Sequence, residues 1–167
     1  MRNALTTRRA ALVTAAAAAA LTLTAAPAAT AATAAPAPQA NDPVTVALSV
    51  QGPDGSIYDD TLSTTGHDVT TPSGGTHPCD GTNNGANDTP GATPTAALDD
   101  AAKNEGFTWD GPWYPSFEDY LVTTIDGKSG GQDAFWSISV NGTPTEVGGC
   151  QLHLKEGDKV AFTWTEL

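Results

Sequence analysis

Two runs of alternating apolar and polar residues near the end of the chain constrain its fold most. Their apolar positions are Trp136, Ile138, Val140, Val160, Phe162 and Trp164. Such alternation is typical of strands in a sheet with one buried face. Asn141-Gly142 ends the first run, and this dipeptide tolerates the positive φ angles of a tight turn. With a second turn at 156–158, the stretch from Phe135 to Trp164 predicts three short strands.

The beginning of the chain predicts an export signal. Three arginines at positions 2, 8 and 9 precede an apolar run from Ala10 to about Ala26, which small-residue sites follow. This is the pattern of a signal peptide, cleaved after Ala31 or alternatively after Ala34. We therefore expect residues 1–31 to be removed, by the Sec route in preference to the twin-arginine route. Residues 32–43 would form a disordered Ala/Pro-rich tether on a secreted domain, residues 44–167.

Removal of the leader leaves four lysines against 19 acidic residues, a net charge of −15. A chain this acidic repels phosphate backbones and anionic lipid, which argues against nucleic-acid partners and against membrane binding after cleavage. The ordinary reason for such charge is solubility outside the cell. The remaining chain, about 125 to 135 residues, suffices for one domain with one core, which we expect to be a monomer.

Cys79 and Cys150 are the only two cysteines. Two cysteines in an exported chain favour a disulfide, which would close a loop of about 70 residues and stabilise the fold by on the order of 4 kcal/mol. The alternative is a zinc site, because His77 and His153 would add two imidazoles to the two sulfurs. Residues three apart on a strand point to opposite faces, however, so we expect the disulfide and no metal.

The first half of the domain predicts a hairpin and a helix. Val44 to Val50 alternates as a strand, a turn follows at 52–55, and 57–65 would return as an edge strand. The polar segment from Gly66 to Gly91 is interpreted as a long loop that Cys79 anchors. Thr93 and Pro94 would begin a helix that Gly106 ends. Its buried stripe would be Ala97, Leu98, Ala101 and Ala102, with Asp99, Asp100 and Lys103 facing solvent.

The segment from Phe107 to Tyr120 holds six of the eleven aromatic residues, and 120–125 would follow as a strand. The expected order is two strands, one helix and four strands. This order predicts an α+β fold: a β-grasp-like mixed sheet of about five to six strands with one helix packed on it and one disulfide.

Five segments together resemble the transcobalamin C-terminal-like domain family, bacterial secreted or surface domains of unknown function. They are VTVALSVQGPDG, TAALDDAAKNEGF, YLVTTIDG, W-x-x-x-V-N-G from Trp136 to Gly142, and L-x-x-G-D-x-V-x-F-x-W from Leu154 to Trp164. The resemblance implies the β-grasp-like fold and a ligand-capping role, because the similar domain of vertebrate cobalamin carriers caps the corrinoid. It transfers no binding residue, and the cysteine pair and the aromatic segment depart from the pattern.

The aromatic segment is the best candidate for a binding surface. We predict Trp109, Trp113, Tyr114 and Phe117 as ligand-binding residues, because exposed aromatic rings offer flat contact area with little entropy to lose. The ligand would be a corrinoid-like small molecule, a glycan or a protein. The alternative is that these rings plug the open end of a small core.

The sequence gives weaker support to two further functions, calcium binding and catalysis. The run from Asp80 to Asp88 partly imitates a calcium loop, but Gly91 stands where the bidentate Glu is required, so we interpret it as a turn. The histidines, at 67, 77 and 153, lie in no catalytic signature. We therefore expect a binding module that is not an enzyme, with no catalytic residues and no cofactor.

The alternative function is a secreted protease inhibitor of the subtilisin-inhibitor type. SGGTHP at 73–78 and TIDGK at 124–128 resemble parts of that family, whose members usually carry two disulfides where this chain can form one. The reactive loop would be the segment around Trp113 to Glu118. Such a loop inhibits only if it is rigid.

Overall fold

The computed structural model of the chain describes residues 41–167, so the predicted signal peptide and nearly all of the predicted tether lie outside the described residues. The central element is a five-stranded sheet with the order β11-β10-β12-β1-β2. Its strands are β1 (Val44–Gly52), β2 (Gly55–Thr64), β10 (Ala134–Val140), β11 (Thr143–Pro144) and β12 (Lys159–Glu166). β1 and β12 pair in parallel and the other neighbours pair antiparallel, which confirms the predicted mixed sheet.

The alternating residues of β1 and β12 form one buried face. Val50 on β1 pairs with Phe162 on β12, and Phe162 pairs in turn with Ile138 on β10. The tight turn after β10 has φ angles of 53° at Asn141 and 81° at Gly142, as the dipeptide predicts. β2 lies at the edge of the sheet, also as predicted.

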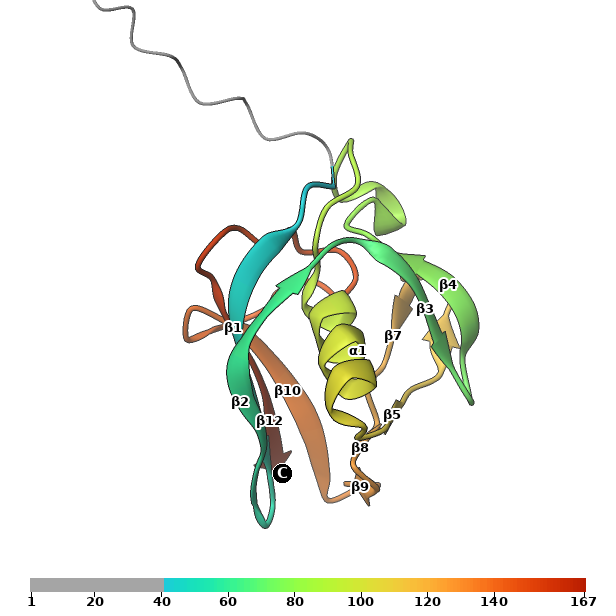
Figure 1. Cartoon of the computed structure of the whole chain (residues 1–167). Coiled ribbons are helices and arrows are strands. Elements are labelled where there is room, and N and C mark those ends of the chain that lie inside the picture. Colours follow the sequence, from blue (N-terminus) through green and yellow to red (C-terminus); the bar gives the residue numbers. More distant parts are fainter. Residues whose placement is uncertain (1–40) are drawn as a thin grey trace, which may run out of the picture. The chain divides into compact units, whose positions relative to one another are not determined.

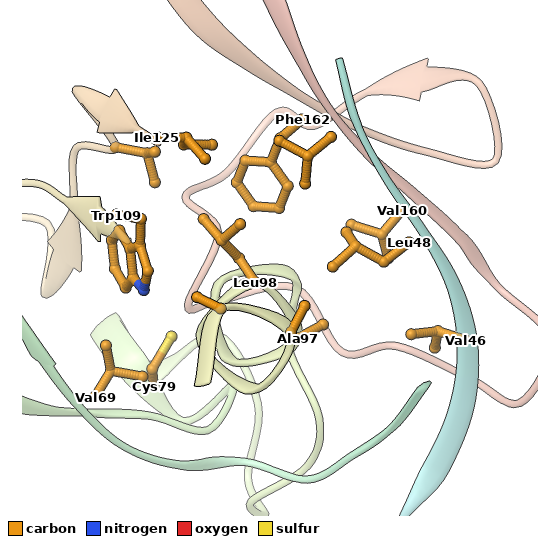
Figure 2. Packing of buried hydrophobic residues seen from close by; sticks show 14 of the residues in the cluster. Val46, Leu48, Val69, Cys79, Ala97, Leu98, Trp109, Ile125, Val160 and Phe162 are labelled. Carbon is orange, nitrogen blue, oxygen red and sulfur yellow. The ribbon is translucent and has the colours of Figure 1, made fainter. Parts of the chain in front are cut away.

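The helix α1 (Pro94–Glu105) has the predicted ends. Thr93 accepts a hydrogen bond from Ala96 N through its side chain, Pro94 occupies the first turn, and Gly106 ends the helix with a left-handed φ of 78°. The four residues of its predicted apolar stripe are buried. In Figure 1 the helix lies between the five-stranded sheet and the smaller strands, and Figure 2 shows Leu98 among core side chains from both sides.

The predicted loop from Gly66 to Gly91 is wrong over its first half, which forms the hairpin of β3 (His67–Thr71) and β4 (Gly75–Cys79). A single 3-10 turn, η1 (Asn83–Gly85), follows. Only Val69, Thr71 and Cys79 are buried in this hairpin, and most of its other residues are polar. The alternation of apolar and polar residues that marks a strand is therefore weak in its sequence. A residue from elsewhere in the chain stabilises the hairpin, because the Tyr120 hydroxyl donates to the carbonyls of Val69 and Gly75.

Lys103 is exposed as predicted and Asp100 is half-buried. Asp99 was also predicted to face solvent, but it is buried because the β3–β4 hairpin covers it. Its carboxylate accepts hydrogen bonds from the Trp109 indole at 3.2 Å and from His67 at 3.0 Å, and pairs with Lys103 at 2.5 Å. Burial alone would raise the pKa of Asp99, but these donors together lower it. The hydrogen bond between His67 and Asp99 also raises the pKa of His67. The network ties β3 to the helix.

The strand predicted over 120–125 is also wrong, because the chain there forms short ladders. They are β5 (Trp109–Asp110), β6 (Trp113–Tyr114), β7 (Asp119–Tyr120), β8 (Thr124–Ile125) and β9 (Lys128–Ser129). β6 pairs with β7 as a hairpin, and β8 lies between β5 and β9. Between the ladders, Leu121 N donates to Pro112 O and Thr123 N donates to Asp110 O, so single backbone bonds replace continuous pairing.

The predicted disulfide is present between Cys79 and Cys150, 71 residues apart, and both cysteines are fully buried. It joins the end of β4 to the segment before β12. The Thr93 hydroxyl donates to the Cys79 carbonyl at 3.1 Å, which places the bridge beside the start of α1. No helix in the part of the chain that the structure describes has the length and apolar character needed to cross a bilayer.

Candidate functional site

A groove of about 450 Å³ lies between the β6–β7 hairpin and the segment from Thr145 to Gln151. Among the described residues, six large hydrophobic side chains are exposed, and four of them line this groove. These four are Tyr114, Phe117, Leu121 and Val147. Buried Asp119, Tyr120 and Gln151 also line it, so we assign them to its floor. Scattered exposed apolar residues are ordinary, but a cluster around a concavity marks a binding site.

A second cavity of about 480 Å³ lies beside the C-terminal end of α1, where Glu105 lines it, and is a weaker candidate. It is lined by the turn between β1 and β2 and by charged residues, including Asp54, Glu105 and Lys128. Lys128 pairs there with Asp54 at 2.6 Å, so part of this charge is already satisfied within the chain. Ile57, Tyr58 and Phe107 also line this cavity, but all three are half-buried, so the described residues around it present no large exposed hydrophobic side chain to a ligand.

The most exposed ring of the groove, Phe117, stands on a turn that is fixed from two sides. Phe117 N donates to Tyr114 O at 3.0 Å, which closes the turn between β6 and β7. The Gln151 side chain donates to Phe117 O at 2.7 Å, and the Asn83 side chain donates to Glu118 O at 2.9 Å. Phe117 is 61% exposed although its backbone is held in place. A ligand would therefore meet a surface whose backbone is already ordered.

The opposite wall approaches the hairpin closely because residue 148 is a glycine. A Cβ atom on Gly148 would lie 1.9 Å from Oδ2 of Asp119, so a side chain at this position would collide with the carboxylate. The wall is also anchored by the disulfide, since Cys150 follows two residues later and its N–H donates to Asp119 at 3.0 Å. The bridge thus fixes both the wall and the floor of the groove.

Asp119 is the unusual residue of this floor, because it is acidic and only 5% exposed. Its carboxylate accepts hydrogen bonds from the backbone N–H groups of Tyr120 at 2.8 Å and Cys150 at 3.0 Å. Burial raises the pKa of Asp119 to about 6, and the two N–H donors reduce this rise. The charged residues that line the groove are Asp119 and Glu146, and both are acidic.

We expect Asp119→Asn to remove a pH dependence of stability. Because the folded state raises the pKa from 3.8 to about 6, it binds this proton more tightly than the unfolded chain does. Wild-type stability is therefore reduced as the pH rises from about 4 to about 6. The difference in free energy of unfolding, variant minus wild type, should increase by on the order of 2 to 3 kcal/mol between pH 3.5 and 7.5.

Urea titrations at a series of pH values measure this difference. Glu146→Gln is the matched control, because Glu146 is an exposed acid of the same groove. The loss of stability with rising pH should persist in this variant, because Asp119 is still present. A difference between Asp119→Asn and the wild type that stays constant with pH would show that Asp119 titrates as an ordinary surface carboxyl.

The structure brings two of the four predicted ligand-binding residues, Tyr114 and Phe117, to the groove. Trp109 is only 7% exposed, belongs to the core and donates to Asp99, so we leave it out of the candidate site. Trp113 is half-buried and stacks on His77 with ring centroids 4.1 Å apart. The alternative prediction, that the aromatic rings complete the core, is therefore correct for Trp109, and it holds in part for Trp113, which packs half-buried against the core.

Sequence reasoning missed Leu121, Val147, Asp119 and Gln151. Val147 is an isolated apolar residue within a polar, glycine-rich segment, and no periodicity marks it. One signal was available: Leu121 falls between Tyr120 and Val122, which are buried, so alternation places it on the outward face. Nothing in the sequence distinguishes Asp119 from the other acids.

The two alternative metal sites are not assembled. Cys79 and Cys150 are joined to each other, so their sulfurs are not available to zinc as thiolates. In the run that imitates a calcium loop, Asp80 accepts hydrogen bonds from Thr82 N and Thr82 Oγ1 and thereby forms a turn. Within residues 41–167, no group of three or more His, Cys, Asp or Glu residues could hold a metal ion.

The comparisons with known proteins give distant matches. Residues 95–166 match the family described as "Domain of unknown function (DUF4430)", a range that runs from α1 to β12. No curated protein matches the sequence.

Two solved structures are similar in backbone. Haptocorrin in complex with Cbi has a TM-score of 0.47 at 15% identity, over 77% of this chain and 26% of that one. The present chain thus spans about a quarter of the length of that protein. A candidate metal-binding protein from Ruminococcus gnavus has a TM-score of 0.43 at 13% identity, over 74% of this chain and 98% of that one. At these scores neither likeness assigns a ligand.

Proposed function

We propose that this chain is a secreted, non-enzymatic binding module that holds a ring-bearing small molecule in the groove between the β6–β7 hairpin and residues 145–151. One observation supports this most: four of the exposed large hydrophobic side chains of the described residues gather around one concavity of about 450 Å³. That volume lies within the range of small-molecule sites, roughly 300 to 1,000 Å³. Two of the four side chains are aromatic and suit the face of a ring.

The size of the groove also bears on the corrinoid that the family resemblance implies. A corrinoid is much larger than a groove of about 450 Å³, so this chain would cover one face or edge of it and could not enclose it. Capping against a second partner would be required for full burial. Smaller ring compounds and the non-polar faces of sugars would fit without a second partner.

Ligand-observed NMR with three probes would test this proposal. The probes are 2-naphthol for neutral rings, cellobiose for glycans and cyanocobalamin for corrinoids. All three probes carry rings, and we expect saturable binding of at least one of them. Replacing both Phe117 and Val147 by serine should weaken that binding by about ten-fold or more, because apolar contact area on two walls is lost.

Phe135→Ser is the matched control, because Phe135 is also an exposed phenylalanine but does not line the groove. It should leave the affinity unchanged. The proposal is contradicted if none of the three probes binds, or if Phe135→Ser weakens binding as much as the double variant does.

The second candidate function is protease inhibition, and the fixed turn favours it. The predicted reactive segment, around Trp113 to Glu118, is held by hydrogen bonds from Gln151 and Asn83. The disulfide lies next to the base of this segment, because Cys150 N donates to Asp119. Such support supplies the rigidity that a reactive loop needs. Incubation with subtilisin separates the two functions: cleavage after Phe117 with full protease activity would exclude inhibition.

A further inference from the structure

The floor of the groove contains a buried carboxylate, Asp119, that has no cationic partner among the described residues. Asp119 is almost fully buried, and within residues 41–167 its only hydrogen-bond donors are the backbone N–H groups of Tyr120 and Cys150. Oδ2 receives Cys150 N alone, at 3.0 Å. A carboxylate can accept about four hydrogen bonds, so this oxygen keeps acceptor capacity. Buried carboxylates usually have a cationic partner, and the residues lining the groove include no Lys, Arg or His.

The surroundings of Asp119 favour a cation from outside the chain. Glu146 lies on the rim of the groove, and the whole chain carries a formal charge of −12. The exposed rings of Tyr114 and Phe117 line the same groove and would also attract a cation through their faces. An anionic ligand would meet two carboxylates and no compensating charge among these lining residues.

We infer that the ligand of this groove is a ring-bearing amine, whose ring lies against Tyr114 and Phe117 and whose protonated nitrogen pairs with Asp119. This inference rests on the proposed function and adds the chemical class of the ligand to it. Asp119 is then a specificity-determining residue. Asp119 would form a charge-assisted hydrogen bond with a cationic ligand, whereas a neutral ring compound would make only the apolar contacts with the groove.

Three indoles that carry a cationic, a neutral or an anionic substituent on carbon 3 test the inference by titration calorimetry at pH 7.5 and physiological salt. They are tryptamine, which is a cation, 3-methylindole, which is neutral, and indole-3-propionate, which is an anion. Wild-type protein should bind tryptamine about ten-fold or more tightly than 3-methylindole, and indole-3-propionate least tightly. The added salt screens the general attraction of an acidic chain for cations.

Asp119→Asn should reduce the preference for tryptamine to about three-fold or less, because Asn retains a hydrogen-bond acceptor but no charge. Glu146→Gln should retain most of the preference, since Glu146 is exposed and screened. These two variants distinguish a specific pair from the charge of the rim.

A pH series on the wild type gives an independent measurement if Asp119→Asn does not fold. Tryptamine keeps its charge from pH 5 to 7.5, whereas Asp119, whose pKa is raised to about 6, becomes protonated in that interval. The preference for tryptamine over 3-methylindole should therefore decrease several-fold below pH 6. The other titratable groups around Asp119 are Glu118, Glu146, Tyr114 and Tyr120, and His77 lies against the Tyr120 ring. Glu146→Gln should show the same decrease, which excludes the rim acid as its source.

The outcomes separate the two proposals. Equal affinity for tryptamine and 3-methylindole, or a preference that survives in Asp119→Asn, would overturn the inference while leaving the groove as a binding site for rings. Absence of binding by all three indoles would overturn the inference, and it would overturn both proposals if none of the three NMR probes binds either.

Discussion

Replacing Cys79 and Cys150 together by alanine should lower the free energy of unfolding by about 4 kcal/mol. The bridge closes a loop of 71 residues, and opening it restores the conformational freedom of that loop in the unfolded chain. Alanine is the suitable replacement because both positions are fully buried and a serine hydroxyl would need a partner there. Urea unfolding of the wild type and the double variant measures the difference.

The double variant should also disturb the groove, because Cys150 N holds the carboxylate of Asp119 and the bridge anchors the adjacent wall. Wild-type protein unfolded under non-reducing conditions should contain no titratable thiol, which is the control for the bridge itself. A loss below about 1 kcal/mol would show that the loop retains its compactness without the disulfide.

Phe162→Ala should destabilise the fold by about 3 to 5 kcal/mol. Phe162 is fully buried at the centre of the sheet, where it pairs with Val50 on one side and Ile138 on the other. Removing its ring leaves a cavity beneath α1 that neighbouring strands cannot fill without breaking their register. Figure 2 shows the ring near Leu98 of the helix.

Phe135→Ala is the control for this second prediction, since it removes the same atoms from an exposed position one strand away. Its effect should remain below about 1 kcal/mol. Equal effects of the two substitutions in urea titrations would contradict the assignment of the buried face.

The sequence was sufficient to predict those parts of the fold that local rules govern. Thr93, Pro94 and Gly106 define the ends of α1 through capping chemistry that acts within a few residues. The alternation in β1 and β12 specifies which face is buried. The disulfide followed from the presence of two cysteines in a chain with a predicted export signal.

The remaining features depend on contacts between residues far apart in the chain. The β3–β4 hairpin is stabilised by Tyr120, which donates to Val69 O from 51 residues away. Asp99 was predicted to face solvent because a helical pattern cannot reveal that this hairpin covers its outer side. The candidate groove combines the β6–β7 hairpin with residues that follow β11, so Val147 could not be linked to Phe117 before the fold was known.

Amide chemical-shift mapping with tryptamine would show whether the groove is the ligand-binding surface of this domain. We expect the largest shifts at Tyr114, Phe117, Leu121 and Val147, which line the groove. Shifts confined to Tyr58 and Lys128 at the polar cavity, or shifts of equal size over the whole domain, would contradict this expectation.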